Sequence, residues 1–168
     1  YTLGDLNAAS ERLGRAVGGH KLVFLLCENS PGLLLSYFSC LNTGAVPLLL
    51  DAHISPELLE GLLAAYQPAF VCVPEDLPQE TRQVLKDFQP HLTLEDAQLL
   101  RRPGTEGPEL HPELALLLTT SGSTGSPKLV RISARNLESN TKSIVEYLGL
   151  TEEERPVTNL AMSYSYGM

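Results

Sequence analysis

The residues best suited to chemistry lie in one loop, residues 119–128, with the sequence Thr-Thr-Ser-Gly-Ser-Thr-Gly-Ser-Pro-Lys. Glycines let successive backbone N–H groups turn toward an anion, hydroxyls add hydrogen-bond donors, and the ammonium group of Lys128 adds a point charge. Residues 114–137 contain no Asp or Glu but include Lys128, Arg131 and Arg135, in a chain whose net charge is −8. A phosphate group would therefore be attracted to this loop and weakly repelled elsewhere.

The composition of this loop also fits a flexible linker, because Gly and Ser are common in both. The flanks favour a phosphate loop, since the apolar run 114–118 predicts a buried strand before it and 129–132 predicts another strand after it. The loop is not of the Gly-x-x-x-x-Gly-Lys type, because Lys128 follows Gly125 by three residues with Pro127 between them. A Gly-x-Gly-x-x-Gly dinucleotide motif is absent as well.

Alternating helix and strand patterns predict the scaffold that positions the loop. Two consecutive strand–helix–strand units imply parallel strands joined by right-handed crossovers. We therefore expect residues 1–168 to form a single α/β piece with a layered, parallel-type sheet and flanking helices, interrupted by an exposed connector at 101–112. The expected helices are 2–17, 31–43, 56–66, 78–88 and 134–148, and the expected strands are 21–27, 46–50, 69–73, 91–94, 114–118, 129–132 and 157–162.

Composition narrows the class of protein. A chain with 43% hydrophobic and 19% charged residues is typical of a soluble globular domain. Its acidic balance argues against nucleic acid or an anionic membrane as the main partner. No apolar run approaches the roughly 20 residues that span a bilayer, and no secretory leader precedes the first helix, so we expect a cytoplasmic location. Because the chain starts at Tyr1 and stops at Met168 inside what looks like a motif, we expect a piece of a longer protein.

Cysteine and histidine form no metal-binding or disulfide pattern. Cys27, Cys40 and Cys72 each lie in an apolar neighbourhood without Cys-x-x-Cys spacing, which indicates buried free thiols. The histidines form no ligand pair at helical spacing, so the chain is not expected to build a metal site on its own. The four of them are scattered along the chain: His20, His53, His91 and His111.

Residues Thr120–Lys128 resemble, throughout their length, the phosphate-binding signature of the adenylate-forming enzymes, which include acyl-CoA synthetases, adenylation domains of peptide synthetases, and luciferases. The resemblance extends to Tyr1–Asn7, which looks like the opening helix of that family, and to Ser133–Leu137, which looks like the segment after the phosphate loop. Leu160–Met168 is similar to the family's acyl-pocket motif. The resemblance implies the acetyl-CoA-synthetase-like N-terminal subdomain of an AMP-binding domain.

For function, the resemblance implies an AMP-forming, ATP-dependent carboxylic acid ligase. A carboxylate would attack the α phosphate of ATP, releasing pyrophosphate, and the acyl group would pass to the thiol of CoA or of a carrier protein's phosphopantetheine. It implies acyl-pocket roles for Tyr164, Tyr166 and Gly167, and a role for Thr124 at the Mg²⁺ ion that accompanies ATP. The residues implied to contact the ATP phosphates are Thr120, Ser121, Gly122, Ser123, Thr124, Gly125 and Lys128.

Several positions depart from the family pattern. Ser126 stands where Lys is frequent, Leu129 where Gly is frequent, and Ala134 where His is common. In the acyl-pocket motif, Ala161 and Tyr164 replace a common Pro and His, which leaves the acid open. The changes at Ser126 and Leu129 support a second hypothesis, a catalytically inactive nucleotide-binding or scaffolding domain of the same fold. A third is a flavodoxin-like sheet that binds another phosphate ligand.

The family's remaining functional groups cannot be placed in this chain. These are the acid that reaches Mg²⁺, the Asp that holds the ribose, the hinge, and the late Lys that serves adenylation. We therefore expect the chain to need the remainder of its own polypeptide and to show no adenylation alone. The identity of the acid, the choice between CoA and a carrier protein, and the oligomeric state are left open by the sequence.

Overall fold

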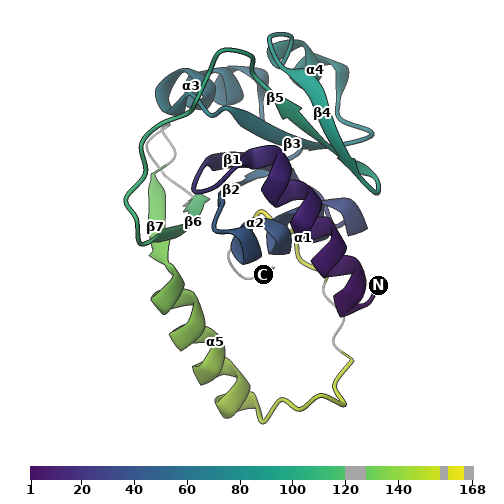
Figure 1. Cartoon of the computed structure of the whole chain (residues 1–168), viewed down its shortest axis with the longest axis vertical. Coiled ribbons are helices and arrows are strands. Elements are labelled where there is room, and N and C mark those ends of the chain that lie inside the picture. The colour runs from purple at the N-terminus through teal and green to yellow at the C-terminus, as the bar shows by residue number, and fades with distance from the viewer. Residues whose placement is uncertain (120–127, 156–158, 165–168) are drawn as a thin grey trace.

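The computed structural model describes residues 1–119, 128–155 and 159–164. Helices and strands alternate through most of the chain, as expected (Figure 1). In chain order they are α1 (Leu3–Val17), β1 (Leu22–Cys27), α2 (Pro31–Thr43), β2 (Val46–Asp51), α3 (Pro56–Tyr66), β3 (Phe70–Pro74), α4 (Gln79–Val84), β4 (Gln89–Leu94), β5 (Ala97–Arg101), β6 (Leu114–Thr119), β7 (Leu129–Ser133) and α5 (Ala134–Leu148).

The described strands form one seven-stranded sheet with the order β4-β5-β3-β1-β2-β6-β7. The four central strands, β3, β1, β2 and β6, are parallel, whereas β5, β4 and β7 join the two sides antiparallel. The predicted α/β fold with a mostly parallel sheet and flanking helices is confirmed. Because parallel strands end at the same edge, the centre of the sheet has one carboxyl edge where four strands deliver their following loops.

Strand β1 shows why the sheet needs helices on both faces. Its side chains alternate between two hydrophobic clusters, and all six of its residues are buried. Val23 and Leu25 pack in the cluster that includes Leu13 of α1 and Leu33 of α2. Phe24 packs on the other face, in the cluster that includes Leu59 of α3. Helices α1 and α2 therefore cover one face of the sheet, and α3 and α4 cover the other (Figure 1).

Local capping sets the predicted helix starts. Thr2 and Asp5 form a capping box at α1, and Ser133 and Asn136 form another at α5. The hydroxyl of Ser30 caps α2 by accepting a hydrogen bond from the Leu33 N–H. The helix α5 differs from the others because none of its residues is buried, and it extends away from the sheet (Figure 1).

Two expectations near the edge of the sheet were wrong. Strand β5 was not predicted, because the turn that links it to β4 is Glu95-Asp96, and Glu95 has a φ of 53°, a region for which hairpin turns normally use Asn or Gly. Helix α4 ends at Val84 rather than near residue 88. Phe88 is buried, and its N–H donates to the Leu85 carbonyl in a turn that leads directly into β4.

The strand expected at 157–162 is not found where the structure describes it. Residues 157 and 158 lie outside the described part of the chain, and residues 159–162 form a bend and a turn. Met162 is buried in the α1–α2 cluster, which accounts for the apolar pattern. The backbone around it is hydrogen-bonded to a side chain instead of a partner strand, as described below.

Candidate functional site

The predicted phosphate loop connects two paired strands. Leu118 of β6 is the register partner of Leu49 in β2, and the two strands are parallel, so their carboxyl ends lie at the same sheet edge. Strand β7 returns antiparallel beside β6, with Thr119 opposite Leu129. This pair closes the connection 120–128 at the carboxyl edge, which is the edge where open α/β sheets bind their ligands.

Lys128 is exposed and directly precedes the first residue of β7. Its backbone is therefore held at the end of β6 by the neighbouring Thr119–Leu129 pair. Most of the other residues predicted to contact phosphate fall in 120–127, outside the described part of the chain: Thr120, Ser121, Gly122, Ser123, Thr124 and Gly125.

The positive charge predicted around the loop is divided by the fold. Arg131 lies in the middle of β7, and Arg135 follows Ser133, whose partner Leu114 is the first residue of β6. Arg135 lies in the first turn of α5, beyond the amino edge, and the five residue steps from Lys128 to Ser133 alone span roughly 16 Å at ~3.3 Å per residue. Arg131 lines a separate hollow of about 300 Å³ together with His111 and Glu113 near that edge. Of the three cations, Lys128 is the one whose position suits the loop.

Polar groups at the ends of the neighbouring strands were missed by the sequence analysis. Asp51 ends β2, and its carboxylate accepts a hydrogen bond of 2.8 Å from the backbone N–H of His53. Asn29 follows β1 by two residues. Asp51 is the exposed last residue of β2 and Asn29 is the second residue after β1, so a position at the carboxyl end of an apolar run is the sequence signal that the two share. Strand order places β2 between β1 and β6, so these groups share the edge with the predicted loop.

The described part of the segment predicted to carry the acyl-pocket motif, residues 160–164, is docked at this same edge. The Asn29 side-chain Nδ2 donates to the Leu160 carbonyl at 2.8 Å, and the Met162 N–H donates to Asn29 Oδ1 at 3.0 Å. Tyr164 follows in a turn, where its N–H donates to the Ala161 carbonyl at 3.0 Å. Tyr164 is 54% exposed. The other two acyl-pocket candidates, Tyr166 and Gly167, lie outside the described residues.

The contacts of Asn29 place the predicted acyl-pocket segment at the same edge of the sheet as the two ends of the predicted phosphate loop. Strands β1 and β6 are separated by β2, which corresponds to two strand spacings or roughly 10 Å. Leu25, Leu49 and Leu118 are level in the register, so the chain leaves β1 and β6 at similar heights. A ligand with a phosphate chain at one end and an acyl group at the other has the dimensions to span this distance.

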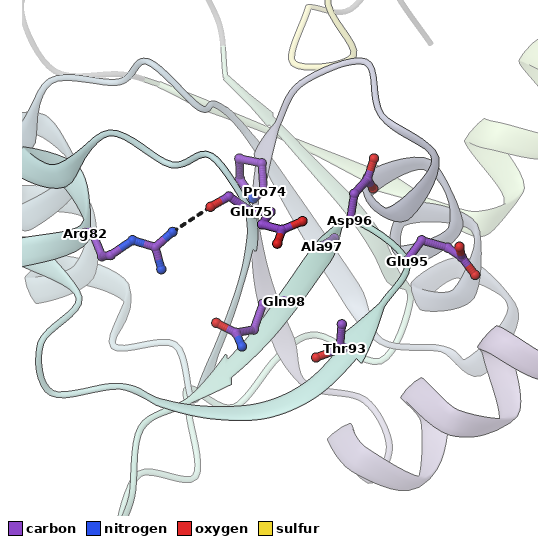
Figure 2. Close-up of a pocket in the computed structure, with 8 residues that line it drawn as sticks. All are labelled: Pro74, Glu75, Arg82, Thr93, Glu95, Asp96, Ala97 and Gln98. Carbon is purple, nitrogen blue, oxygen red and sulfur yellow. Dashed lines mark hydrogen bonds between the residues drawn. The ribbon is translucent and has the colours of Figure 1, made fainter.

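A second hollow lies farther along the sheet, between the β3–α4 loop and the β4–β5 hairpin (Figure 2). Its volume of about 230 Å³ is below the roughly 300–1,000 Å³ of most small-molecule pockets. Its carboxylates disfavour phosphate, and Arg82 donates from Nη2 to the Glu75 carbonyl at 2.9 Å. Asp96 accepts from Gly32 N–H at 2.7 Å and from Ser30 Oγ at 3.1 Å. Asp96 and Arg82 thus hold the fold together.

The three cysteines are buried free thiols, as predicted. Burial raises the pKa of Cys27 to about 12 and that of Cys72 to about 11, and it also raises the pKa of Cys40. These thiols are therefore neutral near pH 7 and unsuited to nucleophilic catalysis. Within residues 1–119, 128–155 and 159–164, no group of three or more His, Cys, Asp or Glu side chains is arranged to hold a metal ion. The helices in those ranges include none with the length and apolarity to cross a bilayer.

A family model described as "AMP-binding enzyme" matches residues 1–168. The chain therefore belongs to the AMP-binding enzyme family, the adenylate-forming group whose phosphate signature its loop resembles. It is 29% identical over 173 residues to a dimodular nonribosomal peptide synthase of Bacillus subtilis (strain 168), covering 95% of this chain and 7% of that protein. It is 25% identical over 174 residues to the D-alanine–D-alanyl carrier protein ligase of Streptococcus equi subsp. equi (strain 4047), covering 98% of this chain and 33% of the ligase.

The fold agrees with that of solved family members. The structure of an O-succinylbenzoate coenzyme A synthetase from Bacillus subtilis, in complex with ATP and magnesium ion, superposes with a TM-score of 0.70 at 19% identity. The match covers 99% of this chain and 46% of the synthetase chain. The chain thus spans a third or less of those two curated relatives and under half of this solved structure.

Proposed function

We propose that this chain is the ATP-binding and acid-binding part of a cytoplasmic, AMP-forming carboxylic acid ligase. The acid's carboxylate attacks the α phosphorus of ATP, the bond to the β-phosphate oxygen breaks, and pyrophosphate leaves with that oxygen. The product is an acyl-adenylate. The sulfur of a thiol, having lost its proton, then attacks the acyl carbon, the bond from that carbon to the phosphate oxygen breaks, and AMP leaves with that oxygen. The observation that carries this proposal is the Thr119–Leu129 pair, which closes the family's signature loop at the carboxyl edge of a parallel sheet.

The residues of the loop suit the phosphate chain of ATP. Phosphoryl transfer needs positioning and neutralisation of charge more than covalent help from the protein. Backbone N–H groups of Gly122 and Gly125, the hydroxyls of Ser121 and Ser123, and the ammonium of Lys128 supply donors and charge without a competing carboxylate in 114–137. The hydroxyl of Thr124 is a suitable oxygen ligand for Mg²⁺, which when bound neutralises further phosphate charge.

The acyl end of the substrate is assigned to the docked segment. The residues that would line or gate the pocket for the acid are Tyr164, Tyr166 and Gly167. Two of the similar proteins leave the acceptor open, because one is a D-alanine–D-alanyl carrier protein ligase and the other is a coenzyme A synthetase. We propose a thiol acceptor of the phosphopantetheine type, which CoA and carrier proteins share.

The test is acid-dependent exchange of labelled pyrophosphate into ATP by the natural full-length polypeptide, across short, long, aryl and amino acids. Lys128→Ala should lower exchange by about 10- to 100-fold, because it removes a charge-assisted contact to phosphate. Arg135→Ala is the matched control. It also removes a cation from residues 114–137, which contain no Asp or Glu, but Arg135 lies beyond the opposite end of β7. It should leave exchange within about twofold, as expected for a screened charge at that distance.

The same assay separates the competing hypotheses. If the folded full-length protein shows no exchange with any of the acids tested, the result would favour the inactive nucleotide-binding or scaffolding domain. Binding of flavin mononucleotide in preference to ATP would favour the flavodoxin-like reading. We also propose that the 168-residue chain alone catalyses no exchange, and turnover by the purified chain would contradict that proposal.

A further inference from the structure

Asn29 joins the first strand of the sheet to the acyl-pocket segment. Its side-chain amide donates to the Leu160 carbonyl and accepts from the Met162 N–H, residues 131 and 133 positions later in the chain. One amide thereby satisfies two backbone groups two residues apart, which is the pattern that a neighbouring strand would offer. Met162 follows this contact into the core, where 5% of its surface is exposed.

Asn29 is itself held rigidly from the other side. It lies between the end of β1 and the N-cap Ser30, whose Oγ donates to Asp96 in the β4–β5 hairpin. The Gly32 N–H donates to the same carboxylate, and a Cβ at Gly32 would lie 2.4 Å from the Leu94 carbonyl oxygen. The loop that bears Asn29 is thus fixed between the sheet and the hairpin, so its amide can orient another segment.

We infer that Asn29 is a positioning residue for acid binding, which sets where the backbone of 160–162, and with it Tyr164, lies at the carboxyl edge. This inference rests on the proposed function. Asn29 acts through residues 160–162 and need not touch ATP, whose phosphates are assigned to the loop after β6. Loss of the two hydrogen bonds of Asn29 should therefore weaken binding of the acid more than binding of ATP.

The test compares variants of the natural full-length polypeptide in the pyrophosphate exchange assay. Asn29→Ala removes both hydrogen bonds and should raise the KM for the acid about 10-fold or more, leaving the KM for ATP within about twofold. Asn29→Asp keeps an acceptor for the Met162 N–H but faces the Leu160 carbonyl with another acceptor. It should give a smaller rise, about threefold to tenfold.

Ser55→Ala is the matched control, because it removes the hydroxyl that caps α3 by accepting from the Leu58 N–H, and Ser55 belongs neither to the loop that bears Asn29 nor to residues 160–162. It should lower thermal stability but leave the KM for the acid within about twofold. Hydrogen exchange provides a readout independent of activity. The Met162 amide should exchange about 10-fold faster or more in Asn29→Ala than in wild type, and at the wild-type rate in Ser55→Ala.

The failures are distinguishable. An active wild-type enzyme whose acid KM is unchanged in Asn29→Ala, or rises equally in Ser55→Ala, overturns this inference and leaves the proposed function standing. If the folded wild-type protein shows no exchange with any of the acids tested, the proposed function and the role of Asn29 in acid binding are overturned together. Unchanged exchange at Met162 in Asn29→Ala overturns the tether itself, whatever the activity.

Discussion

The centre of the sheet and the β7–α5 arm (residues 129–148) are held by different forces. Every residue of β1 is buried, and its two faces pack in separate clusters beneath α1–α2 and α3–α4. In the arm, β7 is an edge strand and α5 buries no residue, although Ser133 and Asn136 form a complete capping box. Full burial stabilises the centre, whereas the arm is held by local hydrogen bonds, by pairing with β6, and by the partly buried side chains of Leu129, Ile132 and Leu137 that pack against the core.

The candidate site lies where these two regions meet. Thr119 ends β6 in the sheet, and Lys128 directly precedes the arm, so the predicted phosphate loop connects the two regions. Asn29 and the segment that it holds belong to the sheet side. A site that joins a rigid element to a less constrained one can fix the acyl end of a ligand while allowing the phosphate end to adjust.

The largest expected difference between the regions comes from paired aromatic truncations. Phe24→Ala removes a fully buried ring and should lower the free energy of unfolding by about 3–5 kcal/mol. Tyr147→Ala in α5 removes a ring that is 88% exposed and should change it by less than about 0.5 kcal/mol. Urea denaturation of the 168-residue chain measures both. Similar losses in the two variants would show that α5 packs on the sheet in solution.

A second pair uses glycines in two helices of the central region. A Cβ at Gly32 would meet three atoms of the β4–β5 hairpin at 2.4–2.6 Å, two of them backbone atoms, whereas a Cβ at Gly61 would meet nothing within 4 Å. Gly32→Ala should destabilise by about 1–3 kcal/mol because the hairpin must shift. Gly61→Ala should stabilise α3 by about 0.5–1 kcal/mol. A stable Gly32→Ala variant would mean that α2 does not dock against the hairpin.

Buried thiols make the stability of the centre fall at alkaline pH. Burial raises the pKa of Cys72 from 9.0 to about 11, so the folded chain holds this proton more tightly than the unfolded chain. The stabilisation is complete below pH 9 and is lost as pH rises from 9 toward 11, at about 1 kcal/mol per pH unit for each such thiol. Urea midpoints at pH 8, 9 and 10 under reducing conditions should fall less steeply in Cys72→Ala. Equal slopes would contradict a buried, protonated Cys72.

Apolar patterns and helix-start signals were sufficient to predict most of the fold. The apolar run 22–27 lies within the strand expected at 21–27, and the helices expected to start at 2, 31 and 134 begin within a residue of those positions. Strand β5 was missed because Glu95 adopts a positive φ without being Gly or Asn, so the turn has no local signature. The strand expected at 157–162 is not found at 159–162, where the backbone groups of Leu160 and Met162 are hydrogen-bonded to the side chain of Asn29, far upstream in the sequence.

The candidate site was predictable only in part for the same reason. The phosphate loop is contiguous, so its residue types and spacing are visible in the sequence. The contact of Asn29 with Leu160 and Met162 depends on tertiary structure, and an exposed Asn after a strand is ordinary in sequence. The division of the cations between the two sheet edges likewise depends on the antiparallel return of β7.

The smallest expected effect separates the two regions by where it is felt. Ser133→Ala and Ser30→Ala each remove a hydroxyl that caps a helix, a change of about 1 kcal/mol at the helix start. Helix α2 is packed in the core, so Ser30→Ala should lower the urea midpoint of the whole chain. Helix α5 buries no residue, so Ser133→Ala should speed hydrogen exchange in its first turns and leave that midpoint unchanged. A midpoint lowered equally by both variants would mean that α5 unfolds together with the sheet, and the Lys128 end of the loop would then be as rigid as the Thr119 end.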